Sequence, residues 1–162
     1  MRACAGLLLL SVLVCLGCSG PPVDLAKGLE IQNVSTGWFD AGIQNGQNKL
    51  VPSISFAVKN VSDQRLRVLD VNTSFRRVTE EKEEWAAEFK AVTGWMGLAP
   101  RATTESLVFR SRLGYTGSDQ SREEMLTNSR FVDAVVEVSA KYGSTQFQRI
   151  GVYPIDRRLI TK

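Results

Sequence analysis

The chain has few of the residues that most often carry out chemistry, because its 162 residues include no histidine and only three cysteines. Without histidine the chain lacks the usual general base, the Ser–His and Cys–His pairs and the commonest metal ligand. Carboxylates can also act as acid and base, but the densest acidic group, at residues 80–84, is typical of a solvated hairpin tip. We therefore expect a protein that is not an enzyme and that holds neither a metal nor a cofactor.

One cysteine has surroundings that suggest a reaction. Cys18 follows Gly17 and an almost wholly apolar run at residues 7–16, and Arg2 supplies a positive charge before that run. A charged start, an apolar stretch of about ten residues and a small residue before the cut describe an export signal. The run is too short for a transmembrane anchor, which needs about 20 residues.

The segment Leu16-Gly17-Cys18-Ser19 resembles the lipobox of bacterial lipoproteins. The resemblance implies that the Cys18 thiol receives a diacylglyceryl group and that signal peptidase II then cleaves before Cys18. Residues 1–17 would be the signal peptide, and a lipid anchor would hold the protein to a membrane of the cell envelope. Ser19 fits the outer membrane, with the domain facing the periplasm. Cys15 and Leu16 depart from the family's preferences, so an ordinary secretory signal is the alternative.

Cleavage before Cys18 would leave it as the only cysteine, because Cys4 and Cys15 would be removed. Stability would then have to come from a hydrophobic core rather than from disulfides. About 145 remaining residues suffice for one domain with such a core. Charges of both signs are scattered along the chain, whereas a nucleic-acid partner usually requires a concentrated basic face. We expect no nucleic-acid partner.

The segment after Cys18 has the composition of a connector. Ser19-Gly20-Pro21-Pro22 combines small residues with two prolines, which resist packing. We expect the lipidated Cys18 and a flexible tether over residues 18–28, followed by one domain over residues 29–162. A connector of about ten residues reaches at most about 35 Å, so it would hold the domain close to its membrane.

The domain shows mostly two-residue periodicity, which is typical of half-buried strands. Residues 54–58 and 132–142 alternate most clearly, and residues 85–89 fit a strand better than a helix in this setting. Residues 60–63 have turn composition, and residues 114–119 are expected to form a loop.

Three further patterns refine this prediction. A change of phase between residues 68 and 69 indicates a bulge, and apolar residues on both phases at residues 147–155 indicate a central or covered strand. Ser121-Arg122-Glu123-Glu124 has the form of a capping box before a short helix at residues 122–128. The sequence predicts an all-β fold: an Ig-like antiparallel β-sandwich of seven or eight strands with one short helix. A small barrel is the alternative.

The run Phe56-Ala57-Val58-Lys59-Asn60-Val61-Ser62-Asp63-Gln64-Arg65-Leu66 resembles the V-K-N-x-S-D-x-x-L hairpin of the FxLYD type of bacterial exported domain. The resemblance covers about 30 residues and departs at Arg76-Arg77, where the family has Tyr-Asp. It implies an Ig-like sandwich in an extracytoplasmic setting and implies no reaction.

Two aromatic sites are candidates for contact with a partner or a ligand. Trp38 and Phe39 follow the first expected strand, and Trp95 and Met96 lie in an apolar segment between glycines. Trp and Met are common at binding surfaces, but the same residues can close the open end of a sandwich core. Closing the core is the interpretation we favour, with contact to a partner or lipid as the alternative.

Together these patterns predict a lipid-anchored, periplasm-facing, non-catalytic binding or scaffolding module of the bacterial cell envelope. Its expected partners are the membrane, through the lipid on Cys18, and an envelope protein. The alternative is a carrier of a lipid or small apolar ligand, which requires an apolar cavity of several hundred cubic ångströms in a sandwich or barrel.

Overall fold

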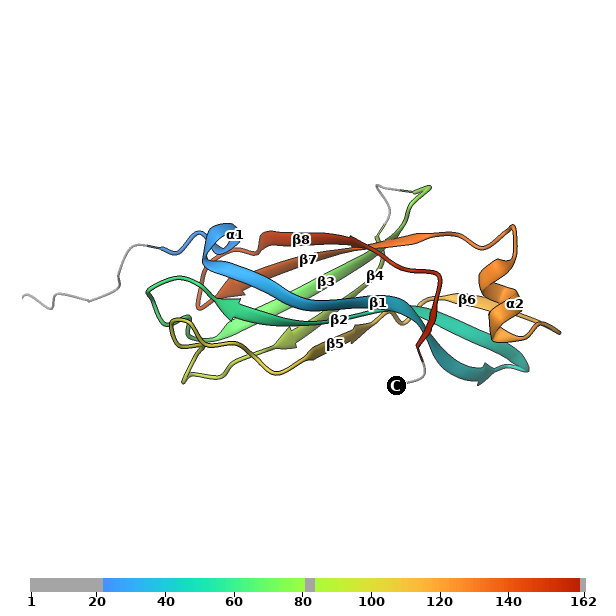
Figure 1. Cartoon of the computed structure of the whole chain (residues 1–162), viewed down its shortest axis with the longest axis horizontal. Coiled ribbons are helices and arrows are strands. Elements are labelled where there is room, and N and C mark those ends of the chain that lie inside the picture. The colour runs from blue at the N-terminus through green and yellow to red at the C-terminus, as the bar shows by residue number, and fades with distance from the viewer. Residues whose placement is uncertain (1–21, 81–83, 161–162) are drawn as a thin grey trace, which may run out of the picture.

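The computed structural model describes residues 22–80 and 84–160, which form two β-sheets packed face to face with two short helices (Figure 1). In chain order the elements are α1 (Leu25–Gly28), β1 (Leu29–Gln44), β2 (Gln47–Asn60), β3 (Leu69–Arg77), β4 (Glu84–Ala91), β5 (Leu107–Arg110), β6 (Tyr115–Gly117), α2 (Arg122–Thr127), β7 (Ala134–Tyr142), β8 (Gln148–Pro154) and β9 (Leu159–Ile160).

The first sheet has the order β5-β2-β1-β9, and β6 also pairs with β2. Its centre is the β1–β2 hairpin, whose register runs from Leu29 opposite Asn60 to Gln44 opposite Gln47. A strand of 14 residues such as β2 is roughly 45 Å long. The hairpin therefore runs the length of the domain, with α1 at one end and α2 at the other (Figure 1).

The second sheet has the order β4-β3-β7-β8. Alternate residues of its central strands are fully buried against the first sheet, among them Val71 and Phe75 of β3 and Val136 and Val138 of β7. From the first sheet, Phe56 stacks on Phe109 with ring centroids 5.5 Å apart. Burial of these two inner faces supplies the main stabilisation of the fold.

The prediction of an all-β sandwich is confirmed, and the strands form two separate sheets rather than one closed sheet. The number of strands was underestimated, because the described residues contain nine strands and two helices. Two of the short strands, β6 in the predicted loop and β9 near the C-terminal end, have only three and two residues. So few residues show no periodicity, and both strands form only through long-range pairing, β9 in parallel with β1.

Two predicted strand details are corrected. The strand expected at residues 147–155 is β8, which lies at the edge of its sheet rather than at its centre. The helix α1 lies against the start of β8, where the Leu25 amide donates to Gln148 Oε1 at 2.8 Å. The phase change before Leu69 is a break rather than a bulge: Val68 has φ of +51° and β3 begins at the next residue.

The flexible tether was expected to extend over residues 18–28, but the chain is already packed against the domain before residue 28. Leu25 is completely buried, Val23 packs against the core, and the Val23 amide donates to the Tyr142 hydroxyl at 2.6 Å. Asp24 caps α1 by accepting from the Ala26 amide. The packed domain therefore begins by Val23 rather than at Leu29, whereas residues 18–21 lie outside the described part of the chain.

The predicted short helix is confirmed as α2, with its capping box. Ser121 Oγ accepts from the Glu124 amide at 3.2 Å, and Glu124 Oε2 accepts from the Ser121 amide at 2.7 Å. Hydrogen bonding of the Glu124 carboxylate to the Ser121 backbone amide, and to a smaller extent to the Ser121 side chain, lowers the pKa of Glu124. Met125 and Leu126 are buried, so the cap holds α2 against the end of the sandwich.

Replacing Ser121 by alanine removes one partner of this reciprocal pair. We expect Ser121→Ala to lower the free energy of unfolding by about 1 kcal/mol, the usual cost of losing an N-cap side chain. Urea denaturation measures the change. The exposed turn residue Ser144 provides the control, because Ser144→Ala should leave the free energy unchanged within about 0.5 kcal/mol.

Candidate functional site

The predicted lipidation site, Cys18, lies outside the described residues, but the start of the domain is well placed relative to it. Pro22 follows Cys18 by four residues, and four extended residues reach at most about 14 Å. From Val23 onward the chain is fixed by its bond to Tyr142 and by the burial of Leu25. A lipid on Cys18 would therefore hold the α1 end of the domain next to the membrane.

The two aromatic residues of β1 have different environments, because neighbouring side chains of a strand point to opposite faces. Trp38 is fully buried and packs edge-on against Phe131, with ring centroids 4.5 Å apart. Phe39 is half-buried, and the Arg110 guanidinium carbon lies 3.6 Å from its ring centroid. The prediction that this pair closes the core is thus confirmed for Trp38, whereas Phe39 forms a cation–π contact on the other face.

The same prediction is wrong for Trp95 and Met96, which are 71% and 72% exposed. They lie at the tip of a tight turn that Gly97 makes possible. Gly97 has φ of +67°, and a Cβ atom there would lie 2.6 Å from the Leu66 carbonyl oxygen. That close approach allows Leu66 and Leu98 to pair, so Leu98 enters the core and the two preceding residues are left outside.

Two arginines that sequence reasoning missed lie beside this turn. The Arg67 guanidinium carbon is 5.0 Å from the Trp95 ring centroid, and Arg65 Nη1 donates to the Met96 carbonyl oxygen at 3.0 Å. Arg65, Arg67, Trp95 and Met96 line a shallow surface pocket of about 230 Å³, and we call these four residues the Trp95 surface. The Arg-Leu-Arg alternation around buried Leu66 is the signal that places both arginines on one side.

Asn60 fixes the loops that carry the Trp95 surface. Although it is completely buried, every polar group of its side chain is used. Its Nδ2 atom donates to the carbonyl oxygens of Gln64, Leu98 and Ala99, and its Oδ1 atom accepts from the Ser62 amide and hydroxyl. The turn predicted at residues 60–63 is therefore confirmed, and it also anchors a second loop distant in the sequence.

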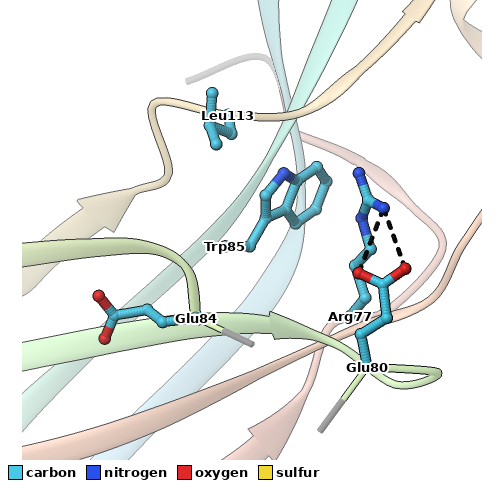
Figure 2. Close-up of a pocket in the computed structure, with 5 residues that line it drawn as sticks. All are labelled: Arg77, Glu80, Glu84, Trp85 and Leu113. Atoms are coloured by element: carbon cyan, nitrogen blue, oxygen red, sulfur yellow. Dashed lines mark hydrogen bonds and ion pairs between the residues drawn. The ribbon is translucent and has the colours of Figure 1, made fainter. Parts of the chain in front are cut away.

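A second pocket, of about 250 Å³, lies beside Trp85 and is lined by Arg77, Glu80, Glu84 and Leu113 (Figure 2). The Arg77 guanidinium carbon lies 5.1 Å from the Trp85 ring centroid, and its Nη1 atom is 3.3 Å from Glu80 Oε1. Charged side chains are three of the five residues that line this pocket and two of the four that line the Trp95 surface. Neither pocket is the enclosed, predominantly apolar cavity that a carrier of an apolar ligand requires.

The carboxylates at the Trp85 pocket do not form an acid–base pair. Glu80 is bound to Arg77, whereas the Glu84 carboxylate points away from Trp85 and accepts from Ser74 Oγ at 2.8 Å (Figure 2). The rest of this acidic group, residues 81–83, lies outside the described residues. Within the described ranges no group of three or more acidic, histidine or cysteine side chains is arranged to hold a metal ion.

Exposed apolar side chains also occur on the outer face of the second sheet. Phe89 is 54% exposed and lies edge-on to Phe147, with ring centroids 6.5 Å apart. Phe89 is opposite Asn72 in the register of β3 and β4, on the side away from buried Val71. This face is therefore available for contact with another protein.

Two arginines near the C-terminal end, Arg157 and Arg158, bind partners within the domain. Arg157 Nε lies 2.6 Å from Asp133 Oδ1, and this hydrogen-bonded pair lowers the pKa of the Asp133 carboxyl. Arg158 Nε donates to the Thr36 carbonyl oxygen at 2.7 Å, next to the parallel pairing of β9 with β1. Both arginines thus fasten the last segment to the sandwich.

No family model matches the chain, and no curated protein matches it. Among solved structures, the chain titled "X-ray structure of Northeast Structural Genomics Consortium target SoR45" is similar, with 10% sequence identity and a TM-score of 0.46 over 81% of this chain and 88% of that chain. In the part of the chain that the structure describes, no helix is long and apolar enough to cross a membrane.

Proposed function

We propose that this protein is a lipid-anchored, periplasm-facing, non-catalytic binding or scaffolding module of the bacterial cell envelope, held in the outer membrane. The observation that carries the proposal is the segment Leu16-Gly17-Cys18-Ser19 after an apolar run. The packed domain beginning by Val23 supports it, since an anchor and a folded module then follow each other directly.

A binding role agrees with the distribution of side chains. The carboxylates beside Trp85 are each bound to another residue, whereas aromatic side chains are exposed at the Trp95 surface and on the outer face of the second sheet. Exposed aromatic residues are typical of contact surfaces. We expect the protein partner to be another component of the envelope.

Photo-crosslinking in cells tests the scaffolding part of the proposal. A photoreactive amino acid replacing Phe89 is expected to capture a specific envelope protein, because Phe89 lies on an open sheet face. The matched control is the same amino acid at Ile43, which is 69% exposed at the far end of the β1–β2 hairpin. No adduct at Phe89, or equal adducts at both positions, would count against a scaffolding role for this face.

A further inference from the structure

The Trp95 surface lies at the same end of the domain as the start of the folded chain. Hydrogen bonds join the two step by step: the Val61 amide donates to the Gly28 carbonyl oxygen at 2.9 Å, and Leu66 exchanges bonds with Leu98. On the other side, the Arg67 carbonyl oxygen accepts from the Gly143 amide next to Tyr142, which also binds Val23. A lipid on Cys18 would bring this end to the bilayer.

Within residues 22–80 and 84–160, the two arginines of the Trp95 surface have no acidic partner. Three ion pairs neutralise neighbouring groups: Asp24 with Lys27, Asp63 with Arg101, and Asp70 with Lys141. None of the ion pairs among the described residues includes Arg65 or Arg67. Arg67 instead lies over the Trp95 ring, and Arg65 binds a carbonyl oxygen through one nitrogen.

From these observations we infer that the Trp95 surface rests in the headgroup layer of the membrane that holds the Cys18 lipid, with Trp95 and Met96 inserted and Arg65 and Arg67 binding lipid phosphates. The inference rests on the proposed lipid anchor. Tryptophan favours the membrane–water interface because its ring is apolar and its N–H is polar. Arginine side chains near an anionic membrane surface are attracted to its negative charge.

Geometry favours a lipid occupant over a protein. Pro22 follows Cys18 by four positions, which allows a separation of at most about 14 Å, so little space remains at this end for a partner between domain and bilayer. The surface is also small and shallow, with a pocket of about 230 Å³. Two arginines that have no acidic partner among the described residues lie beside an exposed indole ring, and this arrangement complements anionic headgroups.

Quenching of tryptophan emission by brominated lipids tests this inference. The acylated full-length product is reconstituted into vesicles of phosphatidylethanolamine and phosphatidylglycerol that carry bromine at shallow acyl positions. We expect the wild-type emission to be quenched and the Trp95→Phe variant to lose that quenching, because Trp38 is buried in the core and Trp85 is half-buried beside it. Arg65→Ala combined with Arg67→Ala should weaken the quenching of Trp95.

A displaced tryptophan provides the matched control. Ile43 is as exposed as Trp95 but lies at the other end of β1, roughly 45 Å away. In the W95F background, I43W should show no quenching. Quenching of I43W equal to that of Trp95, or no quenching of Trp95 in protein whose acylation has been verified by mass, would overturn the inference. Protein without an acyl group would instead contradict the proposed anchor.

Discussion

Cys18→Ala is expected to abolish the incorporation of fatty acid into this protein and to leave the chain at its precursor length. The resemblance to a lipobox implies that the diacylglyceryl group is attached to the Cys18 sulfur atom and that cleavage follows this attachment. Burial of acyl chains is worth about 0.8 kcal/mol per methylene, and two chains are needed for stable anchoring. Loss of the diacylglyceryl group would therefore remove the anchor completely rather than weaken it.

Labelling of cells with an alkyne fatty acid, followed by gel mobility, measures both effects. Cys15→Ala is the matched control, because Cys15 lies in the same leader three residues before Cys18. The control should keep its label and its mature length. A C18A chain that still carries label, or that is shortened as the wild type is, would contradict the assignment of Cys18.

The second large effect is expected at Trp38, the largest of the fully buried side chains. Its ring packs on Phe131 at 4.5 Å and on Trp85 at 6.3 Å between centroids, so removal would leave a cavity that these rings cannot fill. We expect Trp38→Ala to lower the free energy of unfolding by about 4 kcal/mol. Denaturation by guanidinium chloride measures this change.

Two variants make the Trp38 prediction specific. Trp38 Nε1 has no hydrogen-bond partner among the described residues, and an unpaired buried N–H is unfavourable. Trp38→Phe should therefore cost less than about 2 kcal/mol, since the smaller ring loses volume but also loses this N–H. Trp95→Ala should cost less than about 1 kcal/mol, because Trp95 is mostly exposed. Equal losses for W38A and W95A would contradict the different burial of the two indoles.

The parts of the fold that could be predicted are those in which local pattern and tertiary packing agree. In β7, the alternating residues Ala134, Val136 and Val138 are the ones that face the core. The capping box of α2 is local as well, because it is formed by Ser121 and Glu124, which are three positions apart. In β1, by contrast, the register shifts at two places, after Gln32 and after Asp40, which interrupts the alternation that marks a strand.

The candidate site was harder to predict because its exposure depends on contacts distant in the sequence. Trp95 and Met96 have the apolar character of core residues, but the pairing of Leu66 with Leu98 and the close approach at Gly97 leave them outside. Trp38 has the same residue type and lies inside. Residue type alone therefore predicted a contact surface or a core without distinguishing them, whereas the resemblance to a lipobox rests on local sequence alone and stays a prediction.

We propose above all that a lipid on Cys18 attaches this domain to a membrane at its α1 end. The most direct test is the mass of the mature N-terminal peptide, isolated from membranes after proteolysis. We predict a chain that begins at Cys18 and whose mass includes a diacylglyceryl group on the thiol. A mature chain that begins elsewhere, or a Cys18 with a free thiol, would contradict the claim.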